Sequence, residues 1–202
     1  MVRAAFLLMA ALILAACAGP AEPTWAPNAE VERARYVHDG PAKLTLFNVV
    51  TTRNGSGAHA ALMVNADERL LFDPAGTFQV PFVPERNDVL HGVTPRALAA
   101  YIDYHARPSH SVDVYELEVT RSQANRIASL IKANGAVPKA QCAVSIGRIL
   151  KQVPGFESIS LSYFPNALAK AFVGRGGVMR QTITDETADT SHNVTFVRPG
   201  AF

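Results

Sequence analysis

Apolar residues alternate with polar ones in several short runs of this chain, the spacing typical of β-strands. Residues 43–51 (KLTLFNVVT) are rich in β-branched residues and predict a first strand. A Gly-rich turn leads into two apolar runs separated by the polar residues 65–68, which together predict a β-hairpin. Further strands are predicted at residues 111–119, 178–184 and 194–197.

Helical signals lie between these strands. Thr94-Pro95 combines a capping hydroxyl with proline at the first helical position, so a helix is expected from there to about residue 106. A second helix is expected to begin at Thr120 or Ser122 and to end at Asn134-Gly135. Two more helices are predicted: one has Cys142 in its first turn, and the other covers residues 166–172. Residues 78–89 contain several prolines and other helix and strand breakers, and are predicted to form an ordered loop. The fold class predicted is α+β, an antiparallel sheet packed against helices.

The N-terminus has the features of an export signal. Arg3 precedes an apolar run over residues 4–16, which is too short for a mature membrane-spanning helix but fits a signal peptide. The run ends in Leu14-Ala15-Ala16-Cys17, which resembles the bacterial lipobox. The resemblance implies removal of residues 1–16, lipidation of Cys17 and, with Ala18 following, an outer-membrane protein facing the periplasm. A plain secretory signal or a buried helix is the alternative.

Composition and proline content bound the rest of the organisation. Pro20, Pro23 and Pro27 predict a tether over residues 17–40, so the folded domain is expected at residues 41–202. A chain of 202 residues with 49% hydrophobic residues is most simply one such domain. The net charge of +2, without a run of Lys and Arg, argues against a nucleic-acid partner.

Cys142 is the candidate nucleophile. If Cys17 carries lipid, Cys142 is the only remaining thiol and no intramolecular disulfide can form. The start of a helix stabilises an anion, so a cysteine there has a lowered pKa. The backbone N–H of Cys142, and more weakly the side chain of Gln141, are candidate donors to an oxyanion. The structural alternative is a small buried hydrophobic residue.

His59 and Asp73 are the candidate base and its partner. His59 starts the first predicted strand and Asp73 ends the second, so an antiparallel return places both residues near the same end of the hairpin. A carboxylate beside the imidazole would fix its tautomer. Asp73 has a structural alternative, because an Asp-Pro-x-Gly sequence often closes a turn through its carboxylate.

No metal site or cofactor is expected. His105 and His110 lack compact ligand spacing and a nearby carboxylate set, and are interpreted as surface or packing residues. Gly55-Ser56-Gly57 does not have the order of a serine-hydrolase elbow and is interpreted as a turn.

The order of these motifs resembles a known family. Circularly permuted NlpC-type hydrolases of the papain-like fold have a histidine on one strand, a polar residue on the next strand and, later, a cysteine that opens a helix. This sequence resembles that order, with the histidine in Ala58-His59-Ala60-Ala61-Leu62 and the cysteine in Gln141-Cys142-Ala143. The lecithin retinol acyltransferase group and the bacterial YiiX-like group share this order. The resemblance covers residues 43–198. It departs at Asp73, where relatives carry His, Asn, Gln or Glu.

The resemblance implies an envelope cysteine hydrolase acting on amide or ester bonds. His59 would activate Cys142, Asp73 would orient His59, and an acyl group would pass through a thioester. Cell-wall peptides are the expected substrate because of the location. An acyltransferase or lipid amidase acting on acyl lipids is one alternative, and a catalytically silent lipoprotein scaffold is another.

Overall fold

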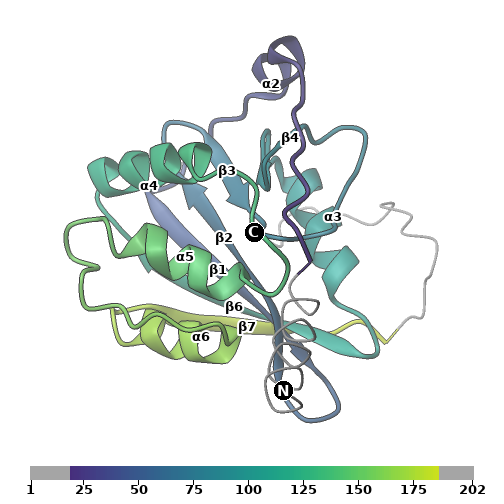
Figure 1. Ribbon diagram of the computed structural model, residues 1–202, viewed down its shortest axis with the longest axis vertical. Coiled ribbons are helices and arrows are strands. Elements are labelled where there is room, and N and C mark those ends of the chain that lie inside the picture. Colours follow the sequence, from purple (N-terminus) through teal and green to yellow (C-terminus); the bar gives the residue numbers. More distant parts are fainter. Residues whose placement is uncertain (1–18, 187–202) are drawn as a thin grey trace, which may run out of the picture.

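The computed structural model describes residues 19–186 as an α+β fold with one antiparallel sheet of seven strands in the order β4-β5-β3-β2-β1-β6-β7 (Figure 1). The lipobox with Cys17 and the strand predicted at residues 194–197 lie outside the described residues. The strands are β1 (Lys43–Thr51), β2 (Gly57–Asn65), β3 (Arg69–Phe72), β4 (Glu85–Arg86), β5 (Val89–Leu90), β6 (His110–Glu118) and β7 (Val178–Ile183). The helices are α2 (Asn28–Ala34), α3 (Pro95–His105), α4 (Arg121–Ala133), α5 (Cys142–Leu150) and α6 (Pro165–Val173).

The β2–β3 hairpin determines where the sheet has a free edge. β1 pairs along most of β2, with Leu46 opposite Leu62. β3 is much shorter and pairs with β2 only from Leu62↔Phe72 to Asn65↔Arg69. The N-terminal half of β2 is therefore not covered by β3, and its outward main-chain groups remain available to other partners.

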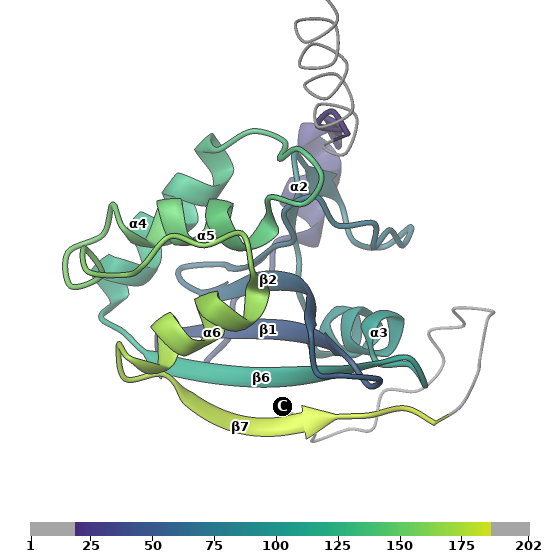
Figure 2. The ribbon, with the colours of Figure 1, turned by 60° about the horizontal axis from the view of Figure 1, so that its bottom comes forward.

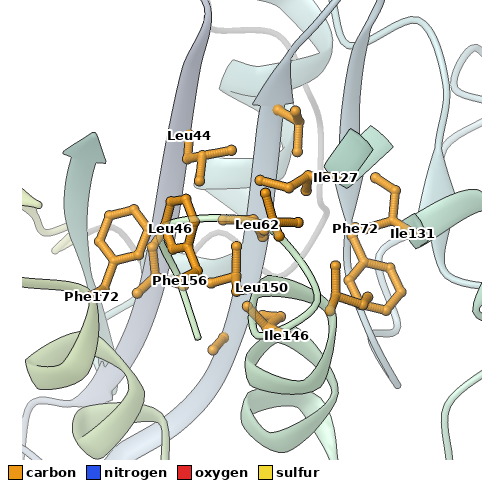
Figure 3. Packing of buried hydrophobic residues seen from close by; sticks show 14 of the residues in the cluster. Leu44, Leu46, Leu62, Phe72, Ile127, Ile131, Ile146, Leu150, Phe156 and Phe172 are labelled. Carbon is orange, nitrogen blue, oxygen red and sulfur yellow. The ribbon is translucent and has the colours of Figure 1, made fainter. Parts of the chain in front are cut away.

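Helices cover both faces of the sheet, as Figures 1 and 2 show. Successive side chains of a strand point to opposite faces. Leu62 thus belongs to the apolar cluster shared with α4, α5 and α6, whereas the neighbouring Ala61 and Met63 belong to the cluster beneath α3. In the first cluster, Leu62 lies among Ile127, Ile146 and Leu150 (Figure 3).

The predicted helix signals are confirmed. The Thr94 side chain accepts a hydrogen bond from the N–H of Ala97 at the start of α3. α4 begins after Thr120, the first of the two predicted caps, and the Thr120 and Gln123 side chains form a reciprocal capping box. The helix ends at Ala133 with Asn134 as its C-cap, and Gly135 has a φ of 77°, the left-handed conformation that glycine adopts at low cost.

Residues 19–40 are the described part of the segment for which the prolines predict a tether. They contain α2, and the main chain on both sides of it is bonded to the domain: Ala26 N–H donates to the Glu85 carbonyl, and Arg69 N–H donates to the Tyr36 carbonyl. Residues 78–89, predicted as a loop, contribute the short strands β4 and the start of β5. Among residues 19–186, none of the helices has the length and apolar character to cross a membrane.

Candidate active site

The hairpin brings His59 and Asp73 into direct contact. The Nε2 atom of His59 lies 2.6 Å from Oδ1 of Asp73. The Asp73 side chain is 3% exposed and that of His59 17%. The turn after β3 is closed by the main-chain carbonyl of Asp73, which accepts from the N–H of Gly76. The interpretation of Asp73 as a turn former through its carboxylate is therefore wrong, because that carboxylate is bonded to the imidazole.

Cys142 meets the same imidazole from α5. It is the first residue of the helix, faces inward as predicted, and is 6% exposed. The His59 side chain and the backbone N–H groups of Ala60 and Ala143 lie close enough to its thiol to lower the pKa of that thiol. Because Nε2 of His59 contacts Asp73, Nδ1 is the nitrogen left to interact with the thiol. Ala60 lies in the part of β2 that β3 does not cover, so the sulfur sits at the free edge of the hairpin.

The charges of the three groups support one another. Burial raises the pKa of the Cys142 thiol, but the hydrogen bond and positive charge of His59 and the two N–H donors bring it below its usual value. Burial lowers the pKa of His59, but the charge and hydrogen bond of Asp73 dominate and raise it to about 10. His59 in turn lowers the pKa of Asp73 against the effect of burial. These shifts favour a thiolate–imidazolium pair over a neutral thiol–imidazole pair, beside an ionised Asp73.

Tyr101 is a site residue that the sequence interpretation missed. Its hydroxyl donates to Oδ1 of Asp73 at 2.9 Å, and its ring is fully buried on α3. The hydroxyl satisfies a second lone pair of a buried carboxylate, which otherwise would cost free energy. The helical spacing shows that Tyr101 lies on α3, but nothing in the sequence points α3 at Asp73.

His105 packs against the rings of His59, Tyr101 and Tyr104, but the prediction that it has no nearby carboxylate is wrong, because Asp73 lies beside it. Its ring stacks on that of His59 with centroids 5.5 Å apart and an angle of 7°. Its Nδ1 lies 2.9 Å from the main-chain carbonyl of Tyr101, one helical turn earlier. Burial lowers the pKa of His105 to about 4, so the ring is neutral. The available signal was its helical spacing from Leu98 and Ile102 on the buried face of α3.

The other sequence candidates lie outside this contact network. Gln141 precedes α5 without a side-chain cap bond, while its carbonyl accepts from the N–H of Ser145. Its role as an oxyanion donor stays a prediction. His110 is bonded through Nδ1 to the Ser109 hydroxyl. The Gly55-Ser56-Gly57 segment is a turn, as predicted, in which the Ser56 carbonyl accepts from Thr51 N–H.

Asp88 links the two segments that carry Asp73 and Cys142. One oxygen of its buried carboxylate accepts from the N–H of Ala75 and from the N–H of Val137. Its main-chain carbonyl accepts from the N–H of Asp73. Because Val137 lies in the connection that leads into α5, a single buried side chain holds the Asp73 turn against that connection.

A groove opens beside His59. It has a volume of about 360 Å³, within the usual range for small-molecule pockets. Its lining includes the rings of His59, Tyr104, His105 and His110 and the side chain of Arg107. The groove gives solutes access to the imidazole pair, and the ionisable side chains around it are predominantly basic.

Gly76 is required by the position of the Asp73 carboxylate. A Cβ at residue 76 would overlap both carboxylate oxygens of Asp73. We therefore expect Gly76→Ala to displace Asp73 and to destabilise the protein by about 1–3 kcal/mol, the usual cost of overpacking. Urea unfolding and the rate of Cys142 alkylation measure both effects in the full chain.

Gly174→Ala is the matched control. Gly174 is helical at the end of α6, and a Cβ there would make only ordinary contacts. Wild-type stability and thiol reactivity in Gly76→Ala would contradict the packing of Gly76 against Asp73.

Comparison with known proteins does not assign a family to this chain. No family model, curated protein or solved structure matches it. The functional argument therefore rests on the contacts of its own residues.

Proposed function

We propose that this chain is a cysteine hydrolase of the bacterial envelope, with Cys142 as nucleophile, His59 as general base and acid, and Asp73 as the group that orients His59. The observation that carries the proposal is that His59 interacts with both other groups: its Nε2 contacts the Asp73 carboxylate, and the same side chain lowers the pKa of the Cys142 thiol. Activated cysteine hydrolases need these three groups in this relation.

The chemistry follows from the positions of the atoms. The Cys142 thiolate attacks the carbonyl carbon of an amide or ester, and the oxyanion accepts from the N–H of Cys142. Nδ1–H of His59 then protonates the leaving amine or alcohol, which leaves an acyl thioester on Cys142. Neutral His59 takes a proton from water as the water attacks the thioester. Release of the carboxylic acid restores thiolate and imidazolium.

Three features support a papain-like, permuted NlpC-type fold for this domain. The histidine strand precedes the cysteine helix in the chain, the orienting residue directly follows the next strand, and the cysteine opens α5. The lipobox-like sequence at Cys17 supports anchoring in the envelope membrane. Cell-wall peptides are then the proposed substrate. Acyl transfer or lipid amide hydrolysis uses the same thioester, and the membrane anchor favours it as the second candidate.

Trapping of the acyl-enzyme tests the proposal. The full chain in mild detergent is incubated briefly with a p-nitrophenyl ester, quenched in acid and analysed by peptide mass spectrometry. We expect one acyl group on Cys142, removable by hydroxylamine, and none in Cys142→Ser under the same conditions. Acylation at another residue would contradict the proposal. Absence of acylation, together with a thiol that the label reaches no faster in the folded than in the unfolded protein, would favour a catalytically silent scaffold.

Substrate class is decided by a second comparison with the same protein. Purified cell-wall peptides and phospholipid vesicles are offered separately, and released amines and fatty acids are measured. Release of amines from the peptides supports the cell-wall assignment. Fatty-acid release or acyl transfer from vesicles alone supports the lipid-directed alternative.

A further inference from the structure

His105 has a place in the site that the proposed reaction does not use. One donor atom each from His59, Asp73 and His105 lie within 4.8 Å of one another. All three come from different elements: β2, the turn after β3, and α3. Three convergent nitrogen and oxygen donors of this kind are the usual protein ligands of Zn²⁺.

Tyr101 contacts two of the three donor residues, as residues that hydrogen-bond to metal ligands commonly do. Its main-chain carbonyl lies against Nδ1 of His105, which fixes the proton on Nδ1 and leaves the Nε2 lone pair free to bind a metal. Its hydroxyl donates to the Asp73 carboxylate. Metal-bound histidines and carboxylates commonly have such partners, and these set the orientation of the ligands.

The spacing of the donors suits Zn²⁺ once one proton is displaced. Bonds of about 2.0–2.2 Å in a tetrahedral site place ligand atoms roughly 3.3 Å apart. The His59–Asp73 separation of 2.6 Å is shorter because a proton lies between the two atoms. Zn²⁺ would replace that proton and widen the pair, and the His105 ring would close toward it. The groove beside these residues leaves a fourth position open to water.

We propose that His59, Asp73 and His105 form a Zn²⁺ site that competes with the thiol chemistry. Binding exchanges the Nε2 proton of His59 for the metal and releases that proton to solvent. His59 then keeps its proton on Nδ1 and has no free nitrogen to act as a base. The consequence for activity rests on the proposed function, whereas the binding itself does not.

Zinc binding to the full chain tests this assignment without an activity assay. The protein, in mild detergent and free of added thiols, is titrated with Zn²⁺ by calorimetry and in competition with a colorimetric chelator. We expect one site, and a loss of affinity of at least about tenfold in His105→Ala, in line with the effect of disturbing metal-site residues. Tyr101→Phe keeps the carbonyl but loses the hydroxyl, and is expected to weaken binding less.

Two controls separate this site from other zinc ligands. His110→Ala removes another histidine from the same groove, outside the three donors, and is expected to bind Zn²⁺ as wild type does. Cys142→Ser, which removes the thiolate without adding bulk beside His59, should leave the affinity within a few-fold of the wild-type value. Unchanged affinity in His105→Ala, or loss of binding in Cys142→Ser, would overturn the assignment. Failure of the hydrolase proposal would instead appear as absence of the acyl-enzyme, with zinc binding intact.

Discussion

Replacing His59 with alanine is expected to lower ester turnover by about 10²–10⁴-fold, the usual contribution of a positioned acid–base group. The variant also loses the partner that lowers the pKa of Cys142, while burial continues to raise it. A thiol with an ordinary pKa near 8.5 is only about 3% thiolate at pH 7. The greater nucleophilicity of a more basic thiolate offsets part of that loss. Alkylation of Cys142 by iodoacetamide should therefore slow by at least about tenfold.

Peptide mass spectrometry measures the alkylation at Cys142 separately from any at Cys17. His38→Ala is the matched control, because His38 accepts from the N–H of Gly40 in the N-terminal segment, away from the thiol. It should alkylate at the wild-type rate. Equal rates in His59→Ala and wild type would show that the imidazole does not activate the thiol, and the proposed mechanism would be abandoned.

The contact between His59 and Asp73 was predictable because it is local. Alternating apolar residues predict both strands of the hairpin, and antiparallel pairing then places the start of β2 near the end of β3. The contact of Cys142 with this pair could not be predicted from strand pairing. Cys142 reaches His59 only because α5 packs on one face of the sheet and opens at its free edge. The sequence suggested that contact through resemblance to a family, not through periodicity.

The misinterpreted parts have physical reasons of their own. α2 has no buried residue, so its sequence carries no apolar stripe to detect, and its flanks are held by main-chain hydrogen bonds that any residue can make. β4 and β5 have two residues each, too few for a period. His105 follows the apolar spacing of α3, a pattern that indicates packing. Whether a half-buried histidine only packs or also serves a site depends on what the opposite element presents, which here is Asp73.

The ion pair makes a second large prediction, on how stability depends on pH. Between pH 7 and 8, an unfolded chain carries most of a proton on Cys142 and at most about a quarter of one on His59, roughly one proton in total when averaged over the range. In the folded protein the pKa of Cys142 is lowered and that of His59 is raised to about 10, and the proposed mechanism requires Cys142 to be a thiolate and His59 to hold the proton. Both states then bind one proton at this pair. The pair should contribute no slope to the free energy of unfolding in this range.

Cys142→Ala removes this cancellation. Asp73 still raises the pKa of His59, so the folded variant binds a proton that the unfolded variant has released. Stability gained from a raised pKa is complete below the unfolded value near 6.5 and is lost as pH rises toward the folded value. When the pH rises from 7 to 8, we expect the free energy of unfolding of Cys142→Ala to fall by about 1 kcal/mol more than that of wild type.

Urea unfolding of the full chain at closely spaced pH values measures this difference, in which contributions from all other groups cancel. The double variant Cys142→Ala/His59→Gln has no titrating group at the pair and should run parallel to wild type. Parallel curves for wild type and Cys142→Ala would have one of two causes: a neutral imidazole in both proteins, or a protonated thiol beside a charged imidazole. Either cause removes the thiolate on which the proposed reaction depends, so a measurement without any substrate can reject the mechanism.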